Sequence, residues 1–445
     1  MSRNLYLKIF IKNKIHLIVK MIFLFMALFV SCRMTELFEE FYPEAEKIMK
    51  KMTKEQKIGQ LFFPRFDNNT KVSDITTKFP GGFVLFEVDF NETENVVINN
   101  IEYIQNLSQK AMNLPLGIAV EEEGGDICRV SLFHRKEKNF SSPHDIYNKS
   151  GIEGILTTDQ EKRDLLRKFK INVNLAPVAD ISENPNDYIY KRALGYALNE
   201  TIKYIEKDVE GYVKDDFTCC AKHFPGYGNN PDTYEYIAID NRTYENFIEK
   251  DFKPFQSGIT SNIPMILVSH NIVLCKDQKY PASISKTWHD ILRNDLNYSG
   301  LILTDDLSLD AIKKYSGDLS PAILAVKAGN DILLTSQFYE HLNATIEAVN
   351  NNTISMDIIE NACKRIIAWK IKYLGARYIE DDEKGKGEDK ISEPDSDNTV
   401  LIIILTLVCT IVLGIIIYFV VRQFFCQNQV NDNDIEKIGP DTNFL

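Results

Sequence analysis

Four polar clusters in this chain follow directly after short apolar runs, and their residue types could do acid/base and nucleophilic chemistry. They contain carboxylates, one Lys and one His: Val120–Asp126 (VEEEGGD), Ala176–Asp180 (APVAD), Lys222-His223 with the loop after it, and Thr304–Ser308 (TDDLS). None of them has the ligand spacing of a metal site. The set suits glycoside hydrolysis, which needs a carboxylate beside an oxocarbenium-like centre and a proton donor for the departing oxygen.

The pair Asp305-Asp306 is the strongest candidate for a nucleophile in this set. Asp305 follows a strongly apolar run, GLILT, which would hold its carboxylate rigidly. Asp306 could equally cap the next helix or make an internal hydrogen bond. The residue types alone do not decide between the two.

The pattern around these clusters predicts alternating strands and helices. Short β-rich runs suggest strands at Gly59–Phe63, Gly82–Glu87, Leu116–Glu121, Val173–Pro177, Cys219–His223, Met265–Ser269, Leu301–Asp305 and Asp331–Thr335. Helical periodicity suggests helices at Glu94–Met112, Thr158–Phe169, Tyr196–Lys214, Tyr244–Gln256, Ser320–Ala328, Gln337–Asn350 and Met356–Leu374. Nearly all-apolar strands between helices predict a parallel sheet that is covered on both faces.

Eight such strand–helix units predict an α/β fold, a (β/α)8 TIM-type barrel, with the polar clusters in the loops that follow the strands. An open doubly wound sheet is the alternative architecture. It is disfavoured because no G-x-G-x-x-G follows a strand, and the pairs Gly81-Gly82 and Gly124-Gly125 lack the third glycine.

Apolar segments near both ends of the chain predict a membrane-anchored ectodomain. A basic flank, a short apolar stretch and Ser31-Cys32 resemble a signal sequence, with an uncleaved anchor as the alternative. Thr399–Val421 is uncharged and long enough to cross a bilayer. We therefore expect a single-pass type I protein with an extracellular or lumenal ectodomain, divided as follows: signal sequence 1–32, barrel 45–376, acidic stalk 377–398, transmembrane helix 399–421 and cytoplasmic tail 422–445.

Composition excludes some classes of partner. The net charge of −12, with no basic cluster among aromatics, argues against nucleic-acid binding.

Five of the eight cysteines lie between the apolar segments and form no CxxC pair, so we expect buried free thiols, with one disulfide as the alternative. No cofactor and no metal are expected. Asn-x-Ser/Thr sequons fit a glycosylated ectodomain: Asn68, Asn91, Asn106, Asn139, Asn148, Asn199, Asn241, Asn297, Asn343 and Asn351.

Six segments, in order along the chain, resemble glycoside hydrolase family 3. They are GGFVLF (81–86), EEEGG (121–125), NLAPVAD (174–180), KHFPG (222–226), PASIS (281–285) and TDDLS (304–308). They look like the single-domain β-N-acetylglucosaminidase branch, and the likeness covers roughly residues 45–375. The resemblance implies a (β/α)8 barrel that hydrolyses terminal β-linked N-acetylhexosamine residues of a carbohydrate with retention of configuration.

The same resemblance implies roles for individual residues. Asp305 would be the nucleophile, and Asp232 would orient the residue at position 234, which is the acid/base histidine of the family. The substrate-binding residues would be Glu121, Arg129, Arg192, Lys222 and His223. Three positions depart from the family pattern: Glu121 stands where an Asp is expected, Asp126 where an Arg is expected, and Tyr227 where a His is expected.

Tyr234 is the departure with the largest expected effect. A phenol with a pKa near 10 is poorly matched to giving and retrieving a proton near neutrality, and loss of such help costs about 100-fold to 10,000-fold in rate. Three functions remain open: a slowed or retuned β-N-acetylhexosaminidase, a glycan-binding pseudoenzyme, and a family 3 enzyme with β-glucosidase or β-xylosidase preference. In the first case the proton donor would be one of Tyr234, Glu121, Glu122, Glu123 and Glu235.

Overall fold

The computed structural model describes residues 36–66, 72–136, 138–231 and 238–379. The expected signal sequence, the transmembrane helix, the tail and nearly all of the stalk lie outside these residues. So do Asp232, Tyr234 and Glu235. Within the described ranges, no helix is both long and apolar enough to cross a membrane.

Parallel strands form the centre of the described structure. Six of them make one sheet in the order β2-β3-β4-β5-β7-β9, and β1 pairs separately with β10. Single bridges from Arg65 to Val84 and from Leu303 to Ile332 connect this pair to β2 and to β9. The strands of these two sheets are β1 (Phe62–Pro64), β2 (Gly82–Val84), β3 (Gly117–Val120), β4 (Val173–Asn174), β5 (Thr218–Phe224), β7 (Met265–Val268), β9 (Leu301–Thr304) and β10 (Leu333–Thr335). A separate short pair, β6 (Ile239–Asp240) with β8 (Ile272–Val273), was not predicted. The fold is therefore α/β, with a half-barrel of parallel strands.

Every one of these strands overlaps a predicted run, but β1 begins later than expected. Gly59 belongs instead to helix α3 (Lys54–Gly59). Thr53 starts this helix by accepting a hydrogen bond from the backbone N–H of Gln56, whose side chain in turn bonds to the backbone of Thr53. This capping box favours a helix over the strand that the apolar pattern predicts.

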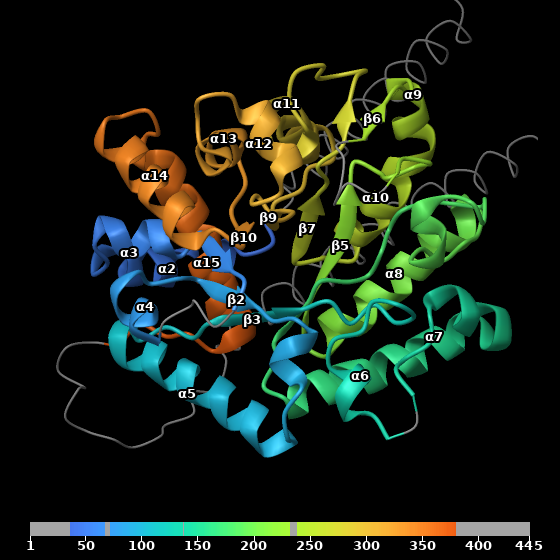
Figure 1. Ribbon diagram of the computed structural model, residues 1–445, viewed down its shortest axis with the longest axis horizontal. Coiled ribbons are helices and arrows are strands. Elements are labelled where there is room, and N and C mark those ends of the chain that lie inside the picture. Colours follow the sequence, from blue (N-terminus) through green and yellow to red (C-terminus); the bar gives the residue numbers. More distant parts are fainter. Residues whose placement is uncertain (1–35, 67–71, 137, 232–237, 380–445) are drawn as a thin grey trace, which may run out of the picture. The chain divides into compact units, whose positions relative to one another are not determined.

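Helices surround the strands (Figure 1). Helix α7 begins at Pro143, well before the expected Thr158, because Ser142 caps it; a bend at Gly151 (φ 62°) divides it. The predicted helix Tyr244–Gln256 consists of α9 (Tyr244–Asn246), η4 (Phe247–Asp251) and α10 (Phe252–Thr260). The other helices are α2 (Tyr42–Lys50), α4 (Val72–Thr77), α5 (Glu94–Met112), α6 (Ser131–His134), α8 (Leu198–Lys214), α11 (Lys286–Asp290), α12 (Asp310–Ser316), α13 (Pro321–Ala328), α14 (Phe338–Asn350) and α15 (Met356–Leu374).

The core explains why the strands are apolar throughout. Adjacent strand residues alternate between two buried clusters: Val84 and Leu267 belong to one, and Phe83 and Ile266 to the other. Each strand therefore buries both faces, as expected for a parallel sheet covered by helices. The five cysteines in the described part of the chain are free, and all but the partly exposed Cys275 are buried. The predicted free thiols are thus confirmed.

Candidate active site

A cavity of about 270 Å³ lies where the strands β2, β3, β5, β9 and β10 end. The predicted nucleophile and the predicted substrate-binding residues all line it: Glu121, Arg129, Arg192, Lys222, His223 and Asp305. The candidate donors Glu122 and Glu123 do not line it. The remaining walls come from Arg65, Val84, Phe86, Ile127, Leu175, Tyr188, Tyr227, Leu267, Asp306, Leu309, Leu334, Thr335 and Ser336. Residues from Arg65 to Ser336 are therefore brought together at the ends of the parallel strands, as expected for such a sheet.

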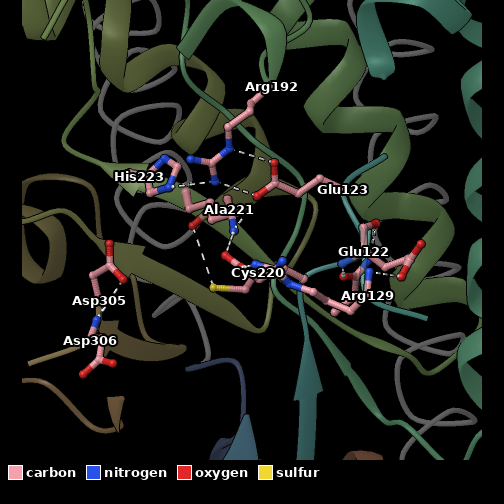
Figure 2. A network of polar contacts seen from close by, with 12 residues as sticks. Glu122, Glu123, Arg129, Arg192, Cys220, Ala221, His223, Asp305 and Asp306 are labelled. Atoms are coloured by element: carbon pink, nitrogen blue, oxygen red, sulfur yellow. Dashed lines mark hydrogen bonds and ion pairs between the residues drawn. The ribbon is translucent and has the colours of Figure 1, made fainter. Parts of the chain in front are cut away.

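Lys222 is the centre of an ionic network in this cavity. It is almost fully buried, and its Nζ donates to Glu121 Oε1 at 2.7 Å and lies 2.6 Å from Glu123 Oε1. Arg192 binds both oxygens of Glu123, through Nε at 3.0 Å and Nη2 at 2.7 Å (Figure 2). Arg129 Nη2 donates to Glu121 Oε2 at 2.7 Å. Positive and negative groups thus alternate along this network.

These contacts keep both glutamates ionised. Burial alone would raise the pKa of Glu121, but the charges of Lys222, Arg129 and Arg192 outweigh it and hold that pKa far below its usual range. Burial would likewise raise the pKa of Glu123, and the charges of Arg192 and Lys222 lower it to about 2. A carboxylate with so low a pKa is not a proton donor near neutrality. Glu121 and Glu123 are therefore poor replacements for an acid/base histidine.

Glu122 takes no part in the ionic network of its two neighbours. It is fully buried and does not line the cavity. Its Oε2 accepts the backbone N–H groups of Arg129 at 3.0 Å and of Val130 at 2.8 Å, and its Oε1 accepts the hydroxyl of Ser131. Glu122 therefore fixes the loop that carries Arg129 to the cavity, which is a structural role.

His223 is oriented by Asp180. The Nδ1 of His223 lies 2.7 Å from Asp180 Oδ2, which also accepts the backbone N–H of His223 at 3.1 Å. The other oxygen of Asp180 accepts the backbone N–H of Tyr227 at 2.7 Å. Because a carboxylate oxygen accepts, Nδ1 donates in this contact, and the other ring nitrogen, Nε2, lies 3.4 Å from Arg192 Nη2.

The structure separates the roles of Asp305 and Asp306. Asp306 Oδ1 accepts the backbone N–H groups of Ser308 at 2.8 Å and Ser336 at 3.0 Å, and its Oδ2 accepts the hydroxyl of Ser336 at 2.5 Å. The carboxylate of Asp305 points in the opposite direction (Figure 2) and accepts the backbone N–H of Asp306 at 2.8 Å. Asp306 is thus committed to holding the loop after β9, and Asp305 faces the cavity.

Several lining residues are absent from the sequence-based prediction. The Arg65 guanidinium lies over the Phe86 ring, 4.2 Å from its centroid, and Arg129 lies over the same ring at 5.4 Å. Arg65 comes directly after β1, so a correct end for that strand would have identified it. Tyr188 lies on the short helix η3 (Tyr188–Lys191) in a long loop, where no local pattern marks it.

Comparison with known proteins gives one family. The model described as "Glycosyl hydrolase family 3 N terminal domain" matches residues 53–369. An "Uncharacterized secreted glycosyl hydrolase" of Arthroderma benhamiae is 28% identical over 65% of this chain and 84% of its own length. A "Beta-hexosaminidase" of Idiomarina loihiensis is 30% identical over 57% of this chain and 75% of its own.

Solved structures of similar fold include a glycoside hydrolase family 3 β-N-acetylglucosaminidase from Paenibacillus sp. FPU-7 and a β-N-acetylhexosaminidase from Beutenbergia cavernae. The first has a TM-score of 0.68 at 24% identity, and the match covers 77% of this chain but only 65% of that one. The second has a TM-score of 0.63 at 23% identity and covers 72% of this chain and 99% of that one. At these identities the likeness concerns the fold.

Proposed function

The chain belongs to glycoside hydrolase family 3, and from that premise we propose that it is a retaining glycosidase that removes terminal β-linked N-acetylhexosamine residues. Support for this sugar comes from the β-hexosaminidases among its relatives. We also infer that the half-barrel and the β1–β10 pair close into a (β/α)8 barrel, because single bridges link β1 to β2 and β10 to β9. The shared cavity at the strand ends is the observation that carries the proposal.

Asp305 would attack the anomeric carbon and form a covalent glycosyl-enzyme, which water then hydrolyses. This choice is supported by its position in the cavity and by the hydrogen bonds that occupy Asp306. Lys222, His223 and Arg192 would bind sugar hydroxyls from the inner wall, with Glu121 and Arg129 beside them. Their ionic network fixes these groups before substrate arrives, which reduces the cost of ordering them on binding.

The departing oxygen still needs a proton. The low pKa values of Glu121 and Glu123 argue against these residues as donors. We therefore propose Tyr234, oriented by Asp232, with Glu235 as the alternative. A tyrosine would make cleavage slow for substrates whose leaving group must be protonated, by about 100-fold to 10,000-fold.

One aryl substrate and one alkyl substrate test this function. We expect an aryl β-N-acetylglucosaminide, whose leaving group needs little protonation, to be cleaved far faster than the methyl glycoside. Asp305→Ala should abolish cleavage of both, while Asp357→Ala, an exposed carboxylate on α15, should leave it unchanged. Tyr234→His should raise the rate for the methyl glycoside more than for the aryl one.

Other outcomes would favour the remaining candidates. Binding of N-acetylglucosamine without cleavage of either substrate would indicate a glycan-binding pseudoenzyme. Faster cleavage of a β-glucoside or a β-xyloside would indicate a different sugar preference within the family. An unchanged rate for Tyr234→His with the methyl glycoside would contradict the assignment of position 234 to the acid/base role.

We also propose that the enzyme is tethered to a membrane by residues 399–421, with the barrel on the extracellular or lumenal side. This proposal depends on the apolar sequence of that segment and on the sequons of the barrel. A tether would keep the cavity near substrates displayed at, or delivered to, the same membrane.

A further inference from the structure

One wall of the cavity consists of three neighbouring rings, those of His223, Tyr227 and Tyr188. The His223 and Tyr227 centroids are 5.4 Å apart in an edge-to-face arrangement, and the Tyr227 and Tyr188 centroids are 5.7 Å apart at 39°. The first two side chains are buried, with 5% and 2% exposed, whereas Tyr188 is 39% exposed. The row therefore runs from the buried inner wall to Tyr188, the most exposed of the three residues.

The loop before Tyr188 holds it in place. Asp187 Oδ2 accepts the hydroxyl of Ser182 at 2.8 Å, and its Oδ1 accepts the side-chain amide of Asn184 at 3.0 Å. The backbone N–H of Asp187 also donates to the carbonyl of Asn184 at 3.0 Å. These bonds close the turn that leads into η3, so the backbone position of Tyr188 is well determined.

The residues after Tyr188 anchor it from the other side. Ile189 is fully buried and forms a small apolar cluster with Val178, Ala193 and Tyr227. The hydroxyl of Tyr190 lies 3.4 Å from His144 Nε2. An exposed ring with a fixed backbone and few rotatable bonds loses little entropy when a ligand covers it. Tyr188 is therefore a preorganised contact surface at the mouth of the cavity.

The size of the cavity indicates what reaches this surface. Its volume of about 270 Å³ falls below the ~300–1,000 Å³ of pockets for drug-sized ligands, so it suits a single sugar ring. If that sugar binds between Asp305 and the inner wall at Lys222 and His223, the leaving group must project through the mouth. There its ring would meet the face of Tyr188, and C–H groups of a sugar or aryl ring pack well against such a π face.

We propose that Tyr188 is a specificity-determining residue that stacks on the leaving group and makes the enzyme prefer substrates whose leaving group is itself a ring. This inference rests on the proposed function, because it requires the cleaved sugar to occupy the cavity. The ring of Tyr188 makes the contact, and its hydroxyl is dispensable. Tyr188→Phe should therefore retain what Tyr188→Ala loses.

The proposal is tested by measuring ligand affinities with isothermal titration calorimetry. All variants are made in the full chain with Asp305→Asn, which prevents turnover. The ligands are N,N′-diacetylchitobiose, which has a second ring, and methyl β-N-acetylglucosaminide, which has none. We expect Tyr188→Ala to weaken binding of the disaccharide about 5- to 10-fold and of the methyl glycoside less than ~2-fold, as stacking energies predict. Tyr188→Phe should stay within ~2-fold for both ligands.

Tyr103→Ala is the matched control, because Tyr103 is a 54% exposed tyrosine on α5 that does not line the cavity. It should change neither affinity, and thermal unfolding should show that Tyr188→Ala remains folded. Equal weakening for both ligands, or a loss in Tyr188→Phe as large as in Tyr188→Ala, would overturn the stacking role.

The same ligands separate this proposal from the proposed function. If the unmodified protein binds both ligands but releases N-acetylglucosamine from neither, the hydrolase assignment fails. In that case a weaker affinity of Tyr188→Ala for the disaccharide alone would still support the stacking role of Tyr188. If it cleaves both and Tyr188→Ala affects them equally, the hydrolase assignment stands and the stacking role is overturned.

Discussion

Glu123 lies between the buried Lys222 and the partly buried Arg192, and this makes it a sensitive position in the ionic network. Only 1% of its side chain is exposed, and it contacts both Lys222 and Arg192. Glu123→Gln removes the negative charge, which leaves Arg192 without its carboxylate partner and Lys222 with Glu121 alone. We expect the free energy of unfolding to fall by about 3–5 kcal/mol, as for other broken buried ion pairs. Urea denaturation at neutral pH measures this loss.

The control for this prediction is Glu161→Gln. Glu161 pairs with Arg135 at 3.0 Å, but 53% of its side chain is exposed. Solvent screens such a pair, so its loss should cost less than about 1 kcal/mol. Similar costs for the two variants would contradict the idea that burial makes the Glu123 network important.

The pKa of Glu123 predicts how this contribution depends on pH. The carboxyl titrates near 4.5 in an unfolded chain and at about 2 in the folded protein. Because the fold favours the ionised form, the contribution is fully present above pH 4.5 and is lost as the pH falls toward 2. At pH 3 the destabilisation by Glu123→Gln should therefore be about 2 kcal/mol smaller than at pH 7. Parallel urea titrations of the two chains at each pH provide the test, and a constant difference would contradict it.

At the scale of elements, the strands could be predicted because each is buried on both faces and is therefore apolar throughout. The assembly of the site could be predicted only in outline. Residues at the ends of the strands face the cavity, so the positions of Asp305, Lys222 and His223 in the cavity could be predicted from the positions of the strands. The contact of Glu123 with Arg192 joins residues 69 apart, and that of Glu121 with Lys222 joins residues 101 apart. No local pattern specifies such pairings.

Loops limited the prediction most. Tyr188 was not identified, because its position at the mouth depends on hydrogen bonds of Asp187 and on packing of Ile189, which are tertiary contacts. Arg65 was not identified because β1 ends at Pro64, one residue beyond the end that the apolar pattern suggests. Acid/base chemistry at position 234 stays a prediction, since that residue lies outside the described part of the chain.

Strand β3 passes so close to its neighbours that a methyl group would not fit at Gly117. A Cβ there would lie 2.5 Å from two ring atoms of Phe63 and 3.0 Å from the ring of Trp369. Both rings are fully buried, so neither can move without disturbing the core. We expect Gly117→Ala to reduce the free energy of unfolding by about 1–3 kcal/mol, measured by denaturant titration.

Gly258→Ala is the corresponding control in a helix. Its added Cβ would have ordinary contacts, the nearest atom being 3.4 Å away on Ile205. Because Gly258 lies inside α10, the change to Ala should stabilise the protein by up to about 1 kcal/mol. If both substitutions lower the free energy of unfolding, close packing at β3 is not the reason for the loss in Gly117→Ala.

At the scale of the whole molecule, the proposed tether should be separable from the enzyme. The strands, the core and the cavity all lie within the described residues up to Tyr378. We expect full-length protein made in a eukaryotic cell to stay with membranes during alkaline carbonate extraction. A chain that ends at Asp397, before the apolar segment, should be released. Release of both chains would contradict the membrane helix.

Sequons on the surface of the α/β fold would report which side of the proposed membrane it occupies. Asn343 is exposed on α14, so a lumenal barrel should carry a glycan there. We expect no glycan on Asn139, because its side chain is only partly exposed and its amide donates to the carbonyl of Gly125 at 2.8 Å, which leaves little room for a sugar in the folded protein. Removal of N-glycans by endoglycosidase should therefore increase gel mobility, and Asn343→Gln should increase it by one glycan step while Asn139→Gln does not. A barrel on the cytoplasmic side would be insensitive to the endoglycosidase in every variant, which would reverse the proposed orientation.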